Sequence, residues 1–280
     1  MKTVGYYNGK IMPVDELSVP ALDRAVYFGD GVYDVVLCRN GKPFTLDMHV
    51  DRFYNSCRAL EIEFPMQKEE LKALLLELVA MADDADTMIY WQASRGTAPR
   101  KHEYPQNGAK ANLLVMITPL KLGDLRKPIR LMTVEDIRFL HCDIKTINLI
   151  PNVMAAEKGR QAGCGEIIFH RGDRVTEGAH SSILLLEGDK VVLPPLDQYV
   201  LPGITRRVIE QLCEKNGIPY ERRVFTLDEL MEADEILVAS TTKHFVPAEE
   251  VDGKKVGGKA PALLKKLQDL FLAELAAQTK

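Results

Sequence analysis

Alternating apolar and polar residues, interrupted by glycine turns, open the chain. The pattern predicts two β-hairpins with Asn-Gly turns, over Val4–Met12 and from Val32 to Leu46. Asp47 follows the second hairpin and is the expected N-cap of a helix. The other elements expected in this half are two helices and two strands, over Asp47–Leu60, Gln67–Ala82, Met88–Ser94 and Asn112–Thr118.

A break in the apolar pattern divides the chain near its middle. Pro119–Pro128 replaces apolar residues with Gly, Pro and charge, which predicts a linker. Beyond it we expect strands and helices over Ile129–Val134, Asn152–Ala162, Glu166–His170, Ser182–Glu187, Thr205–Asn216, Ile236–Ala239 and Pro261–Ala277. Strands and helices mixed on both sides of the linker indicate an α+β protein with two domains, residues 1–120 and 121–280.

Composition narrows the class of protein. The 280 residues are 46% apolar and 27% charged with a net charge of −4, which argues against nucleic acid or an anionic membrane as a partner. No apolar run reaches the roughly 18 residues of a membrane span, and the first residues lack a signal-peptide pattern. Five scattered cysteines without a C-x-x-C pair favour a reducing, cytoplasmic location. The six histidines show no ligand spacing, so we expect no metal site.

Lys145 lies in an apolar stretch between the β-branched residues Ile144 and Ile147. Burial of a lysine disfavours the ammonium form and lowers its pKa, and only the neutral amine attacks a carbonyl carbon. Lys145 is therefore a candidate Schiff-base residue. A lysine on the solvent-exposed face of a strand is the alternative interpretation of the same pattern.

Three further segments could complete a site for pyridoxal 5′-phosphate. Glu177 precedes Gly178, and a carboxylate at such a turn could keep a pyridine nitrogen protonated. A Pro-Gly turn leads into a helix start at Ile204-Thr205, where free N–H groups suit a phosphate. The hydroxyls of Ser240, Thr241 and Thr242 follow an apolar strand and could contribute. Each segment alone is equally compatible with an ordinary loop, a helix cap or a strand end.

Arg100 and His102 lie two residues apart in an extended loop that contains Pro99. Side chains at this spacing can point the same way, and an Arg fork beside a His donor can bind a carboxylate. A solvated basic loop is the alternative interpretation. The order of all these segments resembles fold-type-IV pyridoxal-phosphate enzymes, and the D-amino acid aminotransferases among them, over about Tyr6 to Gln268. The resemblance rests on Phe28–Tyr33, His49–Arg52, Arg95–His102, Cys142–Lys145, Thr176–Gly178, Leu201–Thr205 and Ser240–Thr242.

The resemblance implies a fold and a set of roles. It implies a small N-terminal α/β domain and a larger C-terminal pseudo-barrel domain that carries Lys145, with the cofactor between them. Lys145 is expected to bind the cofactor and move the proton, with Glu177 at the pyridine nitrogen. The phosphate is expected at Arg52, Ile204, Thr205, Ser240 and Thr241, and the substrate at Tyr33, Arg100, His102 and Thr242.

The same resemblance implies a homodimer, because Arg100 and His102 reach the neighbouring subunit's site. The expected reaction is transfer of the amino group of a D-amino acid such as D-alanine to a 2-oxo acid such as 2-oxoglutarate. A branched-chain L-amino acid aminotransferase, an aminodeoxychorismate lyase and an (R)-amine transaminase of the same fold remain alternatives, as does a non-catalytic protein that binds phosphate ligands. The sequence departs from the family at Ala179-His180, where the family's loop is rich in serine.

Overall fold

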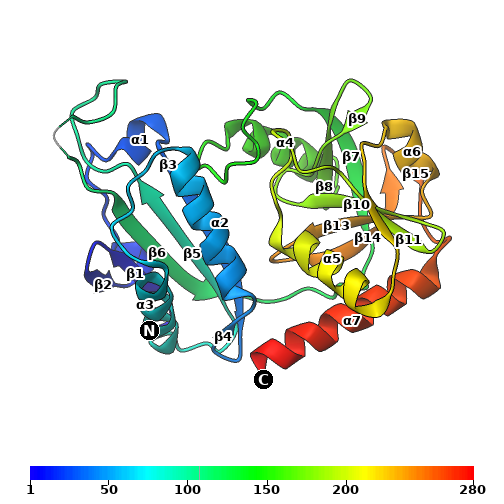
Figure 1. The fold of residues 1–280 in the computed structure, drawn as a ribbon, viewed down its shortest axis with the longest axis horizontal. Helices are drawn as coiled ribbons and strands as arrows, with labels where there is room; N and C mark the ends of the chain where they lie inside the picture. Colours follow the sequence, from blue (N-terminus) through cyan, green and yellow to red (C-terminus); the bar gives the residue numbers. More distant parts are fainter. Residues whose placement is uncertain (107) are drawn as a thin grey trace. The chain divides into compact units, whose positions relative to one another are not determined.

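The computed structural model describes residues 1–106 and 108–280, and its contacts divide the chain into two compact units (Figure 1). The first unit consists of Met1–Lys121, Ile144–Asn148 and Ala276–Lys280, and the second of Leu122–Asp143 and Leu149–Leu275. A domain boundary at residues 120 and 121 stays a prediction. The segment that contains Lys145 groups with the first unit, whereas the sequence interpretation assigned this lysine to the second domain.

An antiparallel sheet in the order β2-β1-β6-β5-β3-β4 is the framework of the first unit. Its strands are β1 (Val4–Tyr7), β2 (Lys10–Met12), β3 (Gly31–Arg39), β4 (Lys42–Pro43), β5 (Thr87–Ser94) and β6 (Asn112–Pro119). Both predicted Asn-Gly turns are confirmed, because Asn8, Gly9, Asn40 and Gly41 all have positive φ. This is the backbone that a two-residue hairpin turn requires.

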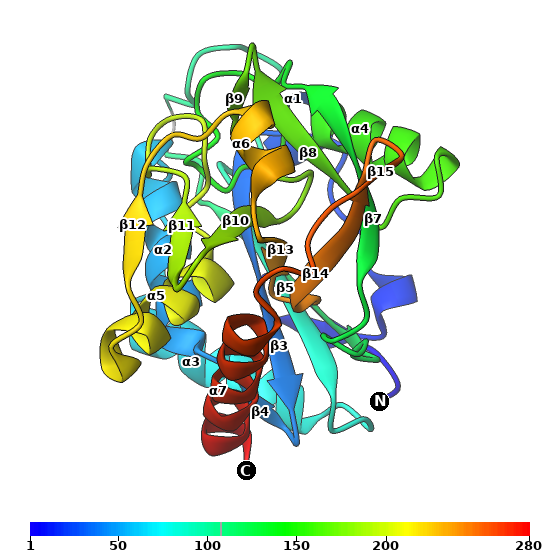
Figure 2. The same ribbon diagram turned by 90° about the vertical axis from the view of Figure 1, so that its right-hand side faces the viewer.

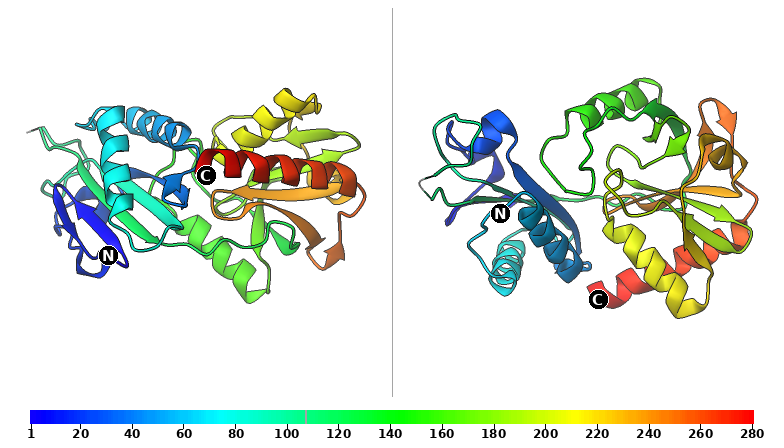
Figure 3. Two further views of the ribbon diagram at one scale, coloured as in Figure 1. Left: turned by 90° about the horizontal axis from the view of Figure 1, so that it is seen from below. Right: turned by 45° about the horizontal axis from the view of Figure 1, so that its top comes forward.

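The helices of the first unit are α1 (Arg24–Phe28), α2 (Leu46–Ala59) and α3 (Lys68–Ala80), beside a short 3-10 turn η1 (Val14–Glu16). Figure 3 shows α2 and α3 on one face of the sheet, where Phe53 and Leu75 join the core around Trp91. The prediction of Asp47 as N-cap is wrong. Thr45 occupies that position in a left-handed conformation, with φ of 55°, and Asp47 lies in the first turn.

The second unit contains a mixed sheet that curls (Figure 2). Over the described residues its order is β12-β11-β10-β13-β14-β7-β8-β9, and β15 pairs with β14. The pairs β11–β12, β14–β7 and β7–β8 are parallel. The strands are β7 (Ile129–Glu135), β8 (Glu166–Arg171), β9 (Arg174–Val175), β10 (Ser182–Glu187), β11 (Lys190–Leu193), β12 (Tyr220–Arg222), β13 (Glu235–Ser240), β14 (His244–Val251) and β15 (Lys254–Lys255).

The helices that accompany this sheet are α4 (Ile150–Gln161), α5 (Ile204–Asn216), α6 (Leu227–Glu232) and α7 (Pro261–Thr279). α4 contacts β8 and α5 contacts β13. Alternate side chains of β10 and β13, among them Ile183, Leu185, Ile236 and Val238, point into one core cluster. Among residues 1–106 and 108–280, no helix is long and apolar enough to cross a membrane.

Candidate active site

Lys145 is attached to the edge of the first unit by its own backbone. Its carbonyl accepts a hydrogen bond from the N–H of Tyr33 at 2.9 Å, and its N–H donates to the Ser56 hydroxyl at 3.2 Å. The next residue, Thr146, forms an antiparallel bridge with Val32. These bonds explain why the segment groups with β3 despite its position in the sequence.

The amine of Lys145 lies over an aromatic ring. Its Nζ is 4.3 Å from the centre of the Tyr33 ring, and that ring stacks on Tyr90 with 5.5 Å between centres. β3 and β5 pair directly, so the two tyrosines are held by adjacent strands. The structure therefore brings together the predicted Schiff-base lysine and the predicted substrate-binding tyrosine.

Arg52 belongs to a buried cluster on α2 and β3. Its Nε and Nη2 donate to the two carboxylate oxygens of Asp34 at 2.9 and 2.7 Å. His49 Nδ1 lies 2.8 Å from the same Asp34 carboxylate. Burial alone would raise the pKa of Asp34, but Arg52 and His49 hold it well below its usual range. Asp34 thus fixes the direction of the guanidinium that was predicted to hold phosphate.

Arg24 holds the loop that follows β5 through hydrogen bonds to the backbone of that loop. This buried side chain donates through Nη1 to the Lys101 carbonyl at 2.7 Å and through Nε to Asp30 at 2.7 Å. Two exposed residues of the loop, Arg100 and His102, contact the same Phe28 ring, with centre distances of 5.1 and 5.0 Å. The structure therefore brings Arg100 and His102 together.

Glu177 is buried in the second unit and has partners on both oxygens. Its Oε1 accepts a hydrogen bond from Nη1 of Arg138, and its Oε2 accepts one from the Leu201 N–H at 3.0 Å. Leu201 precedes the turn that begins α5. Glu177 is therefore tied to the helix start where phosphate binding was predicted.

The first turn of α5 lies beside the end of β13. Gly203 is its N-cap and has no side-chain cap, while Ile204 and Thr205 are buried. A Cβ on Gly203 would lie 2.6 Å from the Ser182 hydroxyl, and Ser182 pairs with Ala239, the neighbour of Ser240. These links place the first turn of α5, which contains Ile204 and Thr205, near the end of β13, where Ser240 is the last residue and Thr241 and Thr242 lie in the turn that follows.

Ala179 and His180, the two residues that depart from the family's serine-rich loop, both contact the buried carboxylate of Glu166. Glu166 accepts a hydrogen bond from the Ser181 hydroxyl at 2.9 Å and one from the Ala179 N–H at 3.3 Å. His180 Nδ1 is 3.1 Å from Glu166, whose side chain is 1% exposed. Lys243 Nζ lies 3.6 Å away on the turn after β13. His180 therefore interacts with Glu166, a contact that the sequence did not indicate.

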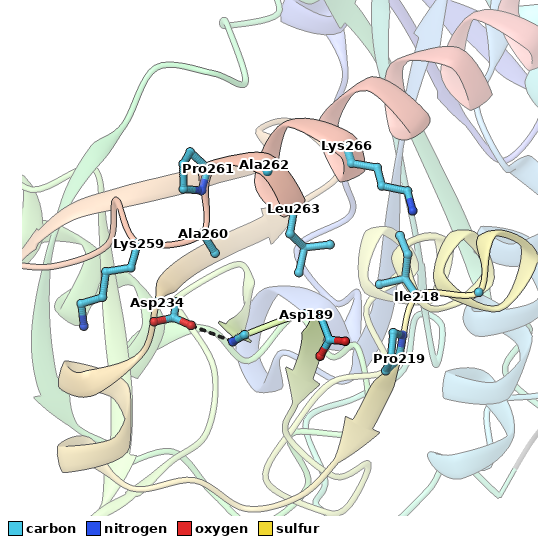
Figure 4. Close-up of a pocket in the computed structure, with 12 residues that line it drawn as sticks. Asp189, Ile218, Pro219, Asp234, Lys259, Ala260, Pro261, Ala262, Leu263 and Lys266 are labelled. Atoms are coloured by element: carbon cyan, nitrogen blue, oxygen red, sulfur yellow. Dashed lines mark hydrogen bonds between the residues drawn. The ribbon is translucent and has the colours of Figure 1, made fainter.

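An open depression of about 430 Å³ lies elsewhere on the second unit (Figure 4). Its lining includes Asp189, Ile218, Asp234, Leu263 and Lys266. None of the site residues predicted from the sequence is among its lining residues, so this depression does not bear on the candidate site.

Comparison with known proteins assigns the family. The family model of amino-transferase class IV matches residues 31–251. A D-alanine aminotransferase of Bacillus licheniformis is 38% identical over 277 residues, covering 96% of this chain and 98% of that protein. The branched-chain aminotransferase of Thermoproteus uzoniensis with norvaline has a TM-score of 0.88 at 23% identity, covering 98% of this chain and 95% of that one.

A second solved structure adds a cofactor derivative. It is a T.th. branched-chain amino acid aminotransferase complexed with N-(5′-phosphopyridoxyl)-L-glutamate, with a TM-score of 0.88 at 24% identity over 98% of this chain and 94% of that one. This chain belongs to the class IV aminotransferases. It is a transferase with the predicted α+β, fold-type-IV architecture, and its cofactor is pyridoxal 5′-phosphate.

The chemistry of the residues fits that cofactor. The start of α5 offers N–H groups that no side chain caps, beside the hydroxyls of Thr205 and Ser240. In the same unit, Glu177 offers a buried carboxylate suited to a protonated ring nitrogen. The first unit contributes a half-buried amine at Lys145 and a guanidinium at Arg52. When bound, the cofactor supplies the electron sink that acidifies the substrate Cα–H.

Proposed function

We propose that this enzyme moves the amino group of a D-amino acid, such as D-alanine or D-glutamate, to a 2-oxo acid such as 2-oxoglutarate. The observation that carries the proposal is the joint contact of Arg100 and His102 with Phe28, on a loop anchored by Arg24. A guanidinium and an imidazole held together form a suitable receptor for a carboxylate. Relatives at 38% and 37% identity bear the name D-alanine aminotransferase, which supports the choice of substrate.

The first unit supplies the amine and the substrate contacts. Lys145 would hold the cofactor covalently and, once released, would take the proton from the substrate Cα and deliver it to C4′ of the cofactor. The ring of Tyr33, 4.3 Å from the amine, limits the directions in which the amine can approach. Tyr33 binds the substrate carboxylate together with Arg100 and His102, which reach this site from the neighbouring subunit of the proposed dimer. A carboxylate held in one place leaves one face of Cα toward the lysine, which selects one enantiomer.

The second unit supplies the remaining cofactor contacts. Glu177 would accept a hydrogen bond from the ring nitrogen. Its carboxylate is buried and already accepts hydrogen bonds from Arg138 and the Leu201 N–H, which keep it in one orientation. The N–H groups of Ile204 and Thr205 and the hydroxyls of Ser240 and Thr241 bind the phosphate, together with Arg52. Thr242, which lies in the same turn as Thr241, contacts the substrate in this proposal.

The test is to add D-alanine or L-leucine separately to the purified enzyme loaded with pyridoxal 5′-phosphate. Visible absorbance of the bound cofactor should fall with D-alanine and return when 2-oxoglutarate is added. Lys145→Ala is the matched variant and should show neither the wild-type absorbance nor turnover. A response to L-leucine alone would move the enzyme to the branched-chain group. No response to either would favour the lyase or the amine transaminase, and an active Lys145→Ala enzyme would overturn the assignment of the lysine.

Arg100 can be tested against its neighbour in the same loop. Arg100→Ala should raise the KM for D-alanine by the equivalent of about 1.5–3 kcal/mol, the scale of a hydrogen bond to a charged group. Lys101→Ala is the control, because this residue is equally exposed and only its backbone contacts Arg24. Steady-state kinetics of both variants decide the question. Equal KM values for the two variants would remove Arg100 from the substrate site.

We also propose a homodimer in the cytoplasm. Exposed apolar side chains gather on α4 and on the segment before Lys145, which suits a surface covered by a second subunit. They are Ile137, Phe139, Leu140, Ile150, Val153 and Met154. Sedimentation equilibrium at the monomer mass of 31.4 kDa would contradict the dimer. All five cysteines are unpaired, as expected in a reducing compartment, and finding the protein outside the cytoplasm by fractionation would contradict the location.

A further inference from the structure

The guanidinium of Arg138 lies between two buried carboxylates of the second unit. Its Nε and Nη2 donate to the two oxygens of Asp136 at 2.9 and 2.8 Å, and its Nη1 donates to Glu177. The three residues are 7%, 4% and 6% exposed. One cation thus connects an acid that the proposed chemistry does not use with the acid proposed to meet the ring nitrogen.

Further contacts fix the orientation of the Arg138 guanidinium. Its guanidinium carbon lies 4.6 Å from the centre of the Phe169 ring, and its Nη2 also donates to the Tyr199 carbonyl at 3.3 Å. Asp136 in turn accepts hydrogen bonds from Arg171 at 3.2 Å and Thr176 at 3.1 Å. Asp136 is held by these groups and binds two nitrogens of Arg138. It therefore orients the guanidinium independently of Glu177.

This arrangement has an electrostatic consequence for Glu177. A guanidinium bonded to a buried carboxylate favours its ionised form. Burial alone would lower the pKa of Arg138, but Asp136 and Glu177 raise it, so the cation persists at every working pH. The charged and titratable groups that face the Arg138–Glu177 pair include Asp136, Cys142, Arg171 and Arg206. Burial raises the pKa of Cys142 to about 11, so this thiol is neutral at pH 7.

We infer that Arg138 is a positioning residue that keeps Glu177 ionised and correctly oriented, so that the proton shared with the cofactor stays on the ring nitrogen. The inference rests on the proposed function, in which Glu177 meets that nitrogen. Without the guanidinium, Glu177 would bind a proton more strongly and compete with the ring for it. The electron sink would then weaken, although the substrate contacts in the first unit would be unchanged.

The experiment compares Arg138→Gln with Arg138→Lys and with Arg174→Gln as the matched control. Like Arg138, Arg174 lies over an aromatic ring, that of Tyr199 at 4.9 Å, but it pairs with Asp197 instead of Glu177. Arg138→Gln should lower kcat at least about tenfold, the equivalent of one pKa unit, with KM for D-alanine changed by less than about threefold. The pH midpoint of the visible absorbance of the bound cofactor should move by about one unit or more. Arg174→Gln should change neither property.

Arg138→Lys keeps the charge but loses the planar fork that binds Asp136 through two nitrogens, so it should move the midpoint less than Arg138→Gln, and still measurably. Urea unfolding of each cofactor-free variant separates a loss of fold from a change at the cofactor. An Arg138→Gln enzyme that is only less stable, with the wild-type midpoint and kcat, overturns the inference. If Arg138→Gln does not fold, a wild-type pH profile in Arg138→Lys overturns it instead. A wild-type enzyme inactive on D-alanine would instead refute the proposed function itself.

Discussion

Two buried clusters of arginine and carboxylate, one in each unit, use the same chemistry in different ways. In the first unit, one carboxylate, Asp34, accepts two hydrogen bonds from Arg52 and lies beside His49. In the second, the guanidinium of Arg138 is shared by Asp136 and Glu177, and Asp136 has further donors. Asp34 thus serves two basic groups, whereas Arg138 serves two acids and keeps a carboxylate when Asp136 is lost. The difference predicts which cluster tolerates substitution.

The largest effect is expected from Asp34→Asn. Loss of this charge removes the carboxylate that binds Arg52 through two nitrogens and lies beside His49, which should lower the free energy of unfolding by about 3–5 kcal/mol at pH 7. Because the pKa of Asp34 is lowered in the folded state, its stabilisation is full above the unfolded value of about 4 and is lost gradually as pH falls from there through the folded value, which lies well below. The difference in unfolding free energy between wild type and variant, measured by urea titration, should therefore begin to shrink below about pH 4 and should still be present at pH 3.

The matched control is Asp51→Asn on the same helix, α2. Asp51 is exposed and pairs with Lys68 at the surface, so its loss should cost no more than about 1 kcal/mol. If Asp34→Asn were no more destabilising than Asp51→Asn, the Asp34 carboxylate would not hold the first cluster together, and the comparison would fail.

A smaller effect is expected from Asp136→Asn. Arg138 keeps Glu177 as a partner, and the asparagine oxygen can still accept a hydrogen bond, so the cost should be about 1–3 kcal/mol. Urea unfolding of Asp136→Asn and Asp34→Asn under the same conditions gives the ratio of the two losses in unfolding free energy. A cost as large as that of Asp34→Asn would show that Glu177 does not compensate for the lost acid.

The smallest effect concerns His49 and is mainly a dependence on pH. Burial lowers the pKa of His49, with Asp34 opposing, so the neutral ring is favoured in the folded state. Stability from this group is present above the unfolded value of about 6.5 and declines as pH falls below it. His49→Gln should cost about 1 kcal/mol at pH 7.5 and flatten the decline between pH 7 and 5. The exposed His141→Gln should leave the wild-type slope, and an equal slope in both variants would contradict the prediction.

The sequence predicted the elements whose cues are local. Both Asn-Gly hairpins, the helices α2, α3, α4, α5 and α7, and the strands β5, β6, β7, β8, β10 and β13 were expected near their observed bounds. β14 was not expected, because it contains Pro247 and ends in acidic residues. Its strand conformation comes from pairing with the preceding strand β13 and with β7, which is far away in sequence.

The site shows the same division. Residue types and spacing identified Lys145, Glu177 and the start of α5, and the structure shows how each is held. Arg138 and Glu166 gave no signal in the sequence. Glu177 comes close to Arg138, and Ser181 to Glu166, only when β7 and β8 pair and the loop after β9 folds back. An acid or arginine followed by no turn or cap motif is indistinguishable from a surface residue in the sequence. The residue roles themselves remain predictions until the variants are measured.

The first unit is assembled from three separate stretches of chain, and this has a consequence for synthesis. Asn40 donates a hydrogen bond to the Thr279 carbonyl at 2.9 Å, and the Thr45 N–H donates to the Gln278 side chain at 3.2 Å. During translation the sheet of this unit can form first, but Ile144–Asn148 and then Ala276–Lys280 join it later. At ordinary elongation rates that wait is on the order of ten to thirty seconds. Lys145 is therefore synthesised after the strands that hold it, and Ala276–Lys280 are synthesised after Lys145.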